Sequence, residues 1–136
     1  MEIKIKEKST IYSSDKVAEI MIKILKAESK SDRQKEHFWG IYLNARNVII
    51  KIELISLGIL DSCITHPRET FNPAITCGAA SLIVVHNHPS GETAPSEKDK
   101  EVTEKLVKAG EILGIPLLEH LIIIENGDYS SMKSLI

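Results

Sequence analysis

Aromatic residues are scarce in this sequence: Phe, Trp and Tyr together make up 4% of the 136 residues. Hydrophobic residues nevertheless reach 43%, and a content that high excludes an intrinsically disordered chain. The hydrophobic core must therefore be built mainly from Ile, Leu and Val. A chain of this length fits one domain, so we expect residues 1–136 to form a single domain that opens with a basic arm at residues 1–11.

Long hydrophobic runs are also missing. The longest, SLIVV (81–85) and LIII (121–124), fall far short of the roughly 18 residues that a membrane span needs. The first ten residues contain no hydrophobic stretch of the kind found in secretory signals. These absences predict a cytoplasmic protein with no membrane partner. The two cysteines, Cys63 and Cys77, form no CxxC pair, and we interpret them as reduced thiols of that compartment.

The formal net charge is small, at −2, and unevenly distributed. Residues 1–35 carry nine Lys or Arg against six Asp or Glu, whereas residues 36–136 carry eight against thirteen. Proteins that bind nucleic acid usually concentrate their basic residues on one face. Here the excess is mild and confined to the N-terminal part, which is typical of a solvated surface and makes a nucleic-acid partner the less favoured prediction.

The spacing of hydrophobic residues predicts a mixture of helices and strands. The expected elements are a helix at 13–28, a hairpin of strands at 37–44 and 48–56, a helix within 66–80, a strand at 81–85, a helix at 97–113, a strand at 117–125 and a short last strand. The polar segment 29–35 is predicted to be a loop, and Pro73 is expected to kink its helix or delay its start. This order predicts an α/β sandwich in which helices cover a mixed sheet.

The segment HNHPSGETAPSEKD (86–99) is the most informative part of the chain. Side chains alternate along a strand, so His86 and His88 point to the same side if the buried strand continues through them. Two neutral imidazoles on one side suit zinc, and a catalytic zinc ion takes three protein ligands and keeps a fourth position for water. Asp99 is the nearest carboxylate on a rigid element and completes such a set.

Ser96 and Asp99 have a second interpretation. A serine followed three residues later by an acidic residue resembles a capping box at a helix start, and an acid in the first turn also complements the helix dipole. His-x-His alone is likewise a weak signal for a metal. The two interpretations are compatible, because a capped helix start is a stiff mount for a metal ligand.

The spacing His86-x-His88, seven residues, Ser96, two residues, Asp99 resembles the JAMM motif of the JAB/MPN metalloprotease family. The resemblance extends over residues 12–136. Four shorter segments resemble the bacterial and archaeal RadC branch of that family: HNHPSG (86–91), EHF (36–38), HPRE (66–69) and EHLIII (119–124).

This resemblance implies a fold, a metal and a reaction. The fold is a three-layer α/β/α sandwich of the cytidine-deaminase-like type. One zinc ion per chain is held by His86, His88 and Asp99, with water as the fourth ligand. An upstream glutamate acts as general base, and Ser96 steadies the tetrahedral intermediate. The implied reaction is hydrolysis of a peptide or isopeptide bond in a peptide or protein-conjugate substrate.

Three glutamates precede the histidines and qualify as the general base: Glu36, Glu53 and Glu69. Glu36 is preferred because it begins a predicted strand and matches the EHF of the family. A solvated surface carboxylate is the alternative interpretation for each of the three. The sequence spacing alone does not decide between them.

Three further residues allow two interpretations each. His66 and Arg68 are candidates to line the substrate groove, although they also fit a helix start with a solvated arginine. His120 lies beside Glu119 in a predicted buried strand and is interpreted as a hydrogen-bonded core histidine. A role for His120 in orienting a metal ligand stays open, because distance along the chain does not prevent contact in space.

Two rival functions stand beside the hydrolase. One is a non-catalytic zinc-binding module that recognises partners. The other is a DNA-repair role, as the RadC name suggests, but the helix-hairpin-helix region usual in full-length RadC proteins has no counterpart in this sequence. A zinc deaminase is excluded because both H-x-E and P-C-x-x-C are missing. The oligomeric state is undetermined, with an edge strand of the hairpin as a candidate contact for a homodimer.

Overall fold

The computed structural model describes residues 1–4, 9–11, 13–58 and 66–136. The elements in chain order are β1 (Glu2–Ile3), α1 (Ser14–Lys26), α2 (Lys30–Arg33), β2 (Glu36–Leu43), β3 (Ile49–Gly58), α3 (Pro67–Cys77), β4 (Ser81–Asn87), α4 (Glu97–Leu113), β5 (Leu117–Ile123), β6 (Tyr129–Ser131) and the 3-10 helix η1 (Lys133–Leu135). Among these residues, no helix is both long enough and apolar enough to cross a membrane. Cys63 and the middle of the basic arm lie outside the described residues, and Cys77 is a half-buried free thiol.

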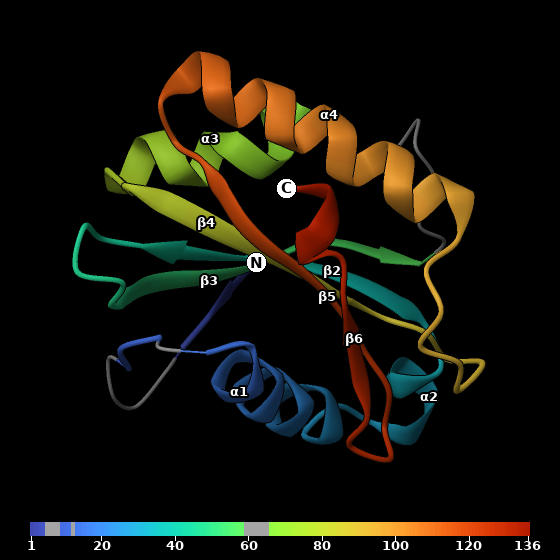
Figure 1. Cartoon of the computed structure of the whole chain (residues 1–136). Coiled ribbons are helices and arrows are strands. Elements are labelled where there is room, and N and C mark those ends of the chain that lie inside the picture. Colours follow the sequence, from blue (N-terminus) through green and yellow to red (C-terminus); the bar gives the residue numbers. More distant parts are fainter. Residues whose placement is uncertain (5–8, 12, 59–65) are drawn as a thin grey trace.

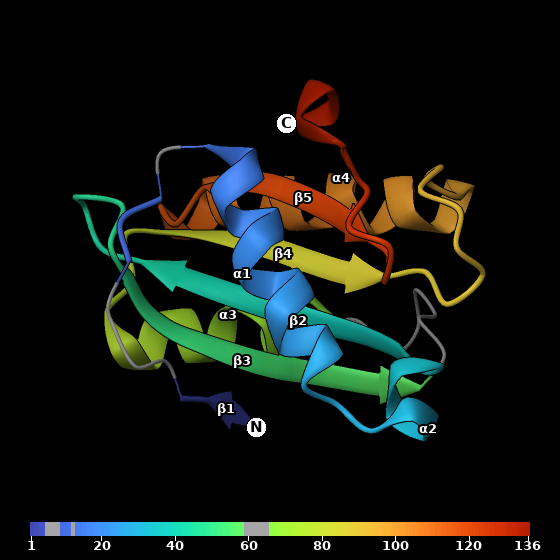
Figure 2. The same cartoon turned by 90° about the horizontal axis from the view of Figure 1, so that it is seen from below.

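The six strands form one mixed sheet in the order β1-β3-β2-β4-β5-β6. All neighbours are antiparallel except β4 and β5, which are parallel. Helices α1 and α2 lie on one face of the sheet, and α3 and α4 lie on the other (Figure 1). Figure 2 shows α1 crossing its face of the sheet obliquely. The fold is therefore the three-layer α/β/α sandwich that the sequence predicts.

Each face of the sheet has its own hydrophobic core, and both are mainly aliphatic. The core under α1 contains Val17, Met21, Leu25, Trp39, Ile41, Ile83, Val85 and Leu121, among others. The core under α3 and α4 contains Phe38, Phe71, Leu82, Val84, Val102 and Leu106, among others. Residues two apart on β2 and β4 belong to the same core, as strand alternation requires. The face that a side chain of β4 points to is therefore fixed by its position along the strand.

The predicted hairpin is confirmed as β2 paired with β3. The Asn44 side chain builds its turn, because Oδ1 accepts the backbone N–H groups of Arg46 at 2.8 Å and Val48 at 3.1 Å. Asn47 adopts a positive φ of 60°, a conformation that Asn tolerates better than most residues. The outer edge of β3 is partly covered by β1, so the hairpin is not a fully open edge.

One local prediction is wrong, and one of the two alternatives predicted for Pro73 is excluded. The polar segment 29–35 contains one helical turn, α2, because the Ser29 hydroxyl accepts the Asp32 N–H at 3.1 Å and caps it. Helix α3 begins at Pro67 and continues through Pro73, so its start is not delayed. Pro67 suits the first turn, where N–H groups have no helical partner. The predicted helix 97–113 is confirmed with the same bounds as α4.

The C-terminal end of α4 lies against the chain that leads into β5. A Cβ atom added to Gly110 would lie 2.6 Å from the carbonyl oxygen of Ile115 and 3.3 Å from the backbone nitrogen of Leu117. The Ile115 N–H also donates to the Gly110 carbonyl at 3.0 Å. Helix and strand therefore approach backbone to backbone, and only glycine leaves room for this contact.

Candidate metal centre

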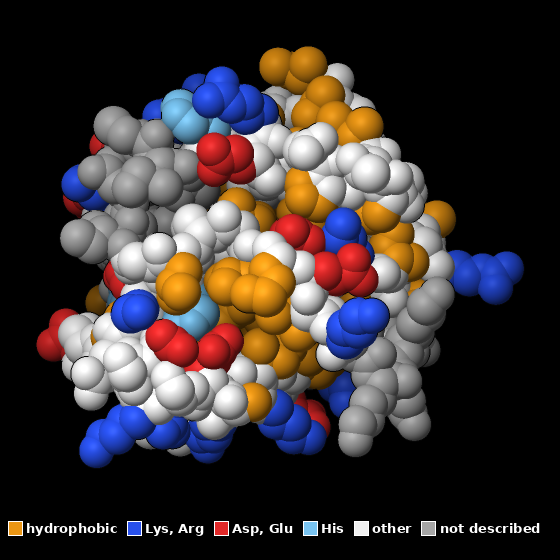
Figure 3. Space-filling model, turned by 180° about the vertical axis from the view of Figure 1, so that it is seen from behind, with side chains coloured by type: hydrophobic (Ala, Val, Ile, Leu, Met, Phe, Trp, Pro, Cys, Tyr) orange, Lys and Arg blue, Asp and Glu red, His pale blue; other side chains and the backbone are white. Residues whose placement is uncertain are grey.

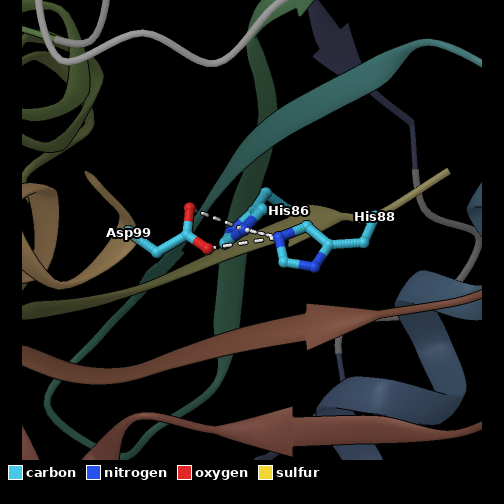
Figure 4. A group of neighbouring side chains, drawn as sticks. All are labelled: His86, His88 and Asp99. Atoms are coloured by element: carbon cyan, nitrogen blue, oxygen red, sulfur yellow. Dashed lines mark hydrogen bonds and ion pairs between the residues drawn. The ribbon is translucent and has the colours of Figure 1, made fainter. Parts of the chain in front are cut away.

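Three potential metal ligands converge where β4 ends and α4 begins. His86 belongs to β4, His88 follows it directly, and Asp99 lies in the first turn of α4 (Figure 4). The Nε2 atoms of the two histidines are 2.9 Å apart. Asp99 Oδ1 lies 3.2 Å from His86 Nε2, and Asp99 Oδ2 lies 3.2 Å from His88 Nε2. One potential ligand atom from each of the three residues lies within 4.8 Å of the other two.

These separations fit a single metal ion. Ligand atoms about 2.0–2.2 Å from a tetrahedral ion lie about 3.3 Å from one another. The observed separations of 2.9 and 3.2 Å are close to that value. The two rings contact different oxygens of Asp99, so the carboxylate must turn slightly to bind an ion through one oxygen. His86 and Asp99 are buried and His88 is half-buried, which keeps bulk water from most of the group. The His86, His88 and Asp99 group could therefore hold a metal ion.

Both histidines are held through the ring nitrogen that faces away from the group. His88 Nδ1 lies 2.8 Å from the backbone oxygen of Glu92, and His86 Nδ1 lies 2.8 Å from His120 Nε2. A carbonyl oxygen can only accept, so His88 carries a proton on Nδ1 and its Nε2 is available as a ligand. This is the usual way in which a protein sets the tautomer of a metal-binding histidine.

Ser96 and Asp99 also form the capping box at the start of α4. The Asp99 N–H donates to the Ser96 hydroxyl at 3.1 Å, and the Ser96 N–H donates to Asp99 Oδ2 at 2.8 Å. The helix-start interpretation of these two residues is therefore confirmed. It does not exclude the ligand interpretation, because the same carboxylate reaches both histidines.

The side chains of this group shift one another's pKa. Burial alone would raise the pKa of Asp99, but hydrogen bonds from His86 and His88 hold that pKa well below its usual value. The hydrogen bond to Asp99 raises the pKa of His88, and burial opposes the rise only in part. Complete burial holds the pKa of His120 well below its usual value, and the neighbouring His86 adds to that effect. His120 is therefore neutral at physiological pH.

The structure separates the three glutamates proposed as general base. Glu36 lines a hollow of about 320 Å³ together with His88, Ser96 and Asp99. Glu53 lies on β3, where it pairs with the N-terminal amino group and with Lys51 at 3.0 and 3.6 Å. Glu69 lines a different hollow. Of the three carboxylates, Glu36 is the one that shares a hollow with the histidine–aspartate group.

Neither His66 nor Arg68 is among the residues that line that hollow. His66 occupies the N-cap position of α3, where its side chain makes no capping hydrogen bond. Arg68 lines a separate hollow of about 600 Å³, whose apolar walls come from Phe71, Ile75 and Leu113. The structure therefore does not bring these two residues together with the candidate ligands.

Asn87, which lies between the two histidines, is a site residue that the sequence reading overlooks. Strand alternation points it to the opposite face of the sheet, where Oδ1 accepts the His37 N–H at 2.6 Å and Nδ2 donates to the Lys35 carbonyl at 3.0 Å. These two bonds hold the backbone on both sides of Glu36. The sequence feature that could have indicated these two bonds is a polar asparagine at the end of a hydrophobic strand, between two candidate ligands.

Comparison with known proteins decides the family. The RadC-like JAB domain family matches residues 11–135, nearly the whole chain. The chain belongs to this family. A UPF0758 protein of Desulforudis audaxviator is 50% identical over 99 residues, which cover 73% of this chain and 43% of the relative. A UPF0758 protein of Methanococcoides burtonii is 53% identical over 100 residues, covering 74% of this chain and 43% of the relative. This RadC-like JAB domain thus spans less than half the length of these relatives.

Proposed function

We propose that this RadC-like JAB domain is a zinc-dependent hydrolase of the JAMM type, which cleaves a peptide or isopeptide bond. One observation carries the proposal: Glu36 and Ser96 line the same hollow as His88 and Asp99. A carboxylate and a hydroxyl thus flank a group that could hold a metal ion. The residue types and their shared hollow support a general base and a hydrogen-bond donor acting on one substrate carbonyl.

Zinc suits the donor set. Two imidazole nitrogens and one carboxylate oxygen are ligands that zinc prefers, and three protein ligands are the number found in catalytic zinc sites. His86, His88 and Asp99 would hold the ion. When bound, zinc lowers the pKa of water and polarises a carbonyl group. The substrate carbonyl would therefore approach from the hollow that Glu36 and Ser96 line.

Glu36 would act as the general base, because its carboxylate lines the hollow beside the candidate ligands. Its half-buried carboxylate takes a proton from the attacking water and returns it to the leaving amine. The Ser96 hydroxyl accepts the Asp99 N–H, so its own hydrogen is available for donation. Donated to the developing oxyanion, that hydrogen stabilises charge that is present only in the transition state.

The surroundings of the hollow favour a peptide-like partner. A second hollow of about 500 Å³, lined by Gln34, Lys35, Glu36, Gly58 and Pro89, shares Glu36 and Pro89 with the first. An extended chain can therefore continue past the reacting carbonyl. On the face shown in Figure 3, Lys and Arg side chains are scattered with acidic ones around a hydrophobic centre. On this face, the described basic residues are not concentrated into the single patch that is usual for nucleic-acid binding.

Mass spectrometry of cleavage products tests the proposal. Zinc-loaded wild type and Glu36→Gln are each incubated with a mixed peptide library and with isopeptide-linked peptides. We expect new termini from the wild type, and a rate at least about 100-fold lower in Glu36→Gln. Glu97→Gln is the matched control, because the Glu97 side chain is 87% exposed and lies in the same first turn of α4 as Asp99. It should retain the wild-type rate.

Two results would overturn the proposal. Full activity in zinc-loaded Glu36→Gln would remove Glu36 from the role of base. Zinc bound without turnover of any library member would instead identify a non-catalytic zinc-binding module.

A further inference from the structure

His86 is joined to two further buried side chains, His120 and Thr103, that the proposed reaction does not use. His86 Nδ1 lies 2.8 Å from His120 Nε2, and His120 Nδ1 lies 2.6 Å from the Thr103 hydroxyl. That hydroxyl lies 2.9 Å from the backbone carbonyl of Asp99. Each of the three side-chain residues has no exposed surface. The chain thus begins at one candidate ligand and ends on the backbone of another.

We propose that His120 and Thr103 are positioning residues that hold His86 in the tautomer able to bind the metal through Nε2. The inference rests on the proposed function only in assuming that a metal ion binds at His86, His88 and Asp99. It requires no turnover. It assigns His120 to the metal site rather than to the hydrophobic core alone.

Metal binding fixes the position of each proton along the chain. With His86 Nε2 bound to a metal, its proton must be on Nδ1, and a buried N–H needs an acceptor. His120 Nε2, 2.8 Å away, is that acceptor, so the proton of the His120 ring is on Nδ1. That proton goes to the Thr103 oxygen, and the Thr103 hydrogen goes to the Asp99 carbonyl. Every donor in the chain then has an acceptor.

The opposite direction of hydrogen-bond donation, from Thr103 to His120 to His86, would prevent His86 from binding the metal. If Thr103 donates to His120 Nδ1, then His120 Nε2 donates to His86, and the His86 proton moves to Nε2. That proton points at Asp99 Oδ1, 3.2 Å away, and occupies the position of a ligand lone pair. Metal binding therefore requires the direction that ends on the Asp99 carbonyl, and Thr103 must be able to accept from His120.

Packing holds the relay in place. The Phe38 ring meets His120 edge-on, with ring centroids 6.0 Å apart and an interplanar angle of 89°. The parallel register places His120 opposite Val84, two residues before His86 on β4. Thr103 lies one helical turn after Asp99 on α4. The chain consequently joins β4, β5 and α4 at the point where the candidate ligands meet.

Zinc affinity measured by chelator competition tests the inference. Thr103→Val keeps the side-chain shape and removes the acceptor, and His120→Phe removes both ring nitrogens. We expect each variant to raise the zinc Kd about 10- to 100-fold. Thr103→Ser restores a hydroxyl and should recover an affinity within a few-fold of wild type. Thr76→Val is the matched control, because the Thr76 hydroxyl makes the same helical bond, to the Asn72 carbonyl at 2.8 Å, on an exposed surface.

Nitrogen-15 NMR of the zinc-loaded wild type gives a second readout, independent of activity. His120 should carry its proton on Nδ1, and a proton on Nε2 would overturn the inference. An unchanged zinc Kd in Thr103→Val would also overturn it, as would a wild type that binds no zinc. Zinc binding that depends on Thr103, without hydrolysis, would overturn the proposed hydrolase and leave this inference standing. Hydrolysis by the wild type, together with an unchanged zinc Kd in Thr103→Val, would support the hydrolase and overturn this inference.

Discussion

The Nε2 atoms of His86 and His88 lie 2.9 Å apart. His88 Nδ1 carries a proton for the Glu92 carbonyl, so the Nε2 of the neutral ring presents a lone pair towards the other histidine, and the charged ring donates to Asp99. Two ring nitrogens this close are stable together only when a proton or a metal cation lies between them or beside them. Asp99 supplies the compensating negative charge, with one oxygen 3.2 Å from each ring. The predictions on metal binding follow from this arrangement.

Asp99→Asn should abolish tight zinc binding and leave the helix start intact. The amide oxygen of asparagine can still accept the Ser96 N–H, but the negative charge and the strongest oxygen ligand are lost. We expect about one zinc per wild-type chain and little in Asp99→Asn, measured by elemental analysis after zinc loading and dialysis. Asp32→Asn is the matched control, because Asp32 occupies the same cap position in α2. Stoichiometric zinc in Asp99→Asn would remove Asp99 from the ligand set.

Zinc affinity should fall as the pH is lowered. A histidine must be neutral to bind a metal, and the pKa of His88 is raised by its hydrogen bond to Asp99. Protons therefore compete with zinc from above the usual histidine pKa of about 6.5. We expect the zinc Kd to rise about tenfold per pH unit once one proton must be displaced. A Kd that stays constant between pH 8 and pH 5 would contradict this.

The metal-free protein should show the opposite trend over part of the same range. A raised folded-state pKa means that the His88 contribution to stability is complete below about 6.5 and is lost as the pH rises through the raised pKa. The lowered pKa of Asp99 gives a contribution that is complete above about 3.9 and is lost as the pH falls through the lowered pKa. Urea unfolding should show both losses in wild type and a flatter profile in Asp99→Asn.

Asn87→Ala should destabilise the fold by about 1–3 kcal/mol, because it leaves the buried His37 N–H without its acceptor and removes the bond from Asn87 to the Lys35 carbonyl. Urea unfolding measures the change. Asn72→Ala, on the exposed side of α3, is the control and should change stability by less than about 0.5 kcal/mol. Equal stability of Asn87→Ala and wild type would show that these two bonds beside Glu36 contribute nothing.

Leu106→Ala should cost about 2–5 kcal/mol of unfolding free energy, because it leaves a cavity between α4 and the sheet. Leu106 is 1% exposed, whereas Leu113, on the same helix, is 46% exposed. Leu113→Ala is therefore the matched control, with an expected change below about 1 kcal/mol. Similar losses in the two variants, measured by urea unfolding, would contradict the assignment of Leu106 to the core.

Local patterns were enough to predict the elements that carry the candidate ligands. Helical periodicity and two clear boundaries predicted α4, and alternation placed His86 and His88 on one side of a strand. The single turn α2 escaped prediction because a serine cap, rather than a hydrophobic pattern, determines it. Short elements of this kind leave little periodic signal.

The relations between segments could not be predicted in the same way. His120 reaches His86 because β4 and β5 pair in one particular parallel register. Glu36 reaches the hollow because Phe38 pairs with His86 across β2 and β4. A register depends on contacts between residues far apart in the chain, and a single sequence does not specify those contacts. The family resemblance favoured Glu36 among the three glutamates, whereas spacing alone did not.

The close backbone contact at Gly110 links the C-terminal part of α4 to the position of Asp99 at its other end. Gly110 lies eleven positions after Asp99 on the helix, a distance of about 16 Å at 1.5 Å per residue. A larger side chain at Gly110 must push the helix away from the Ile115 carbonyl. A tilt of a few degrees about the Gly110 contact moves the other end of the helix by about an ångström. A shift of that size is comparable with the error in ligand position that a metal site tolerates. The position of the Asp99 carboxylate therefore depends on residue 110 being glycine.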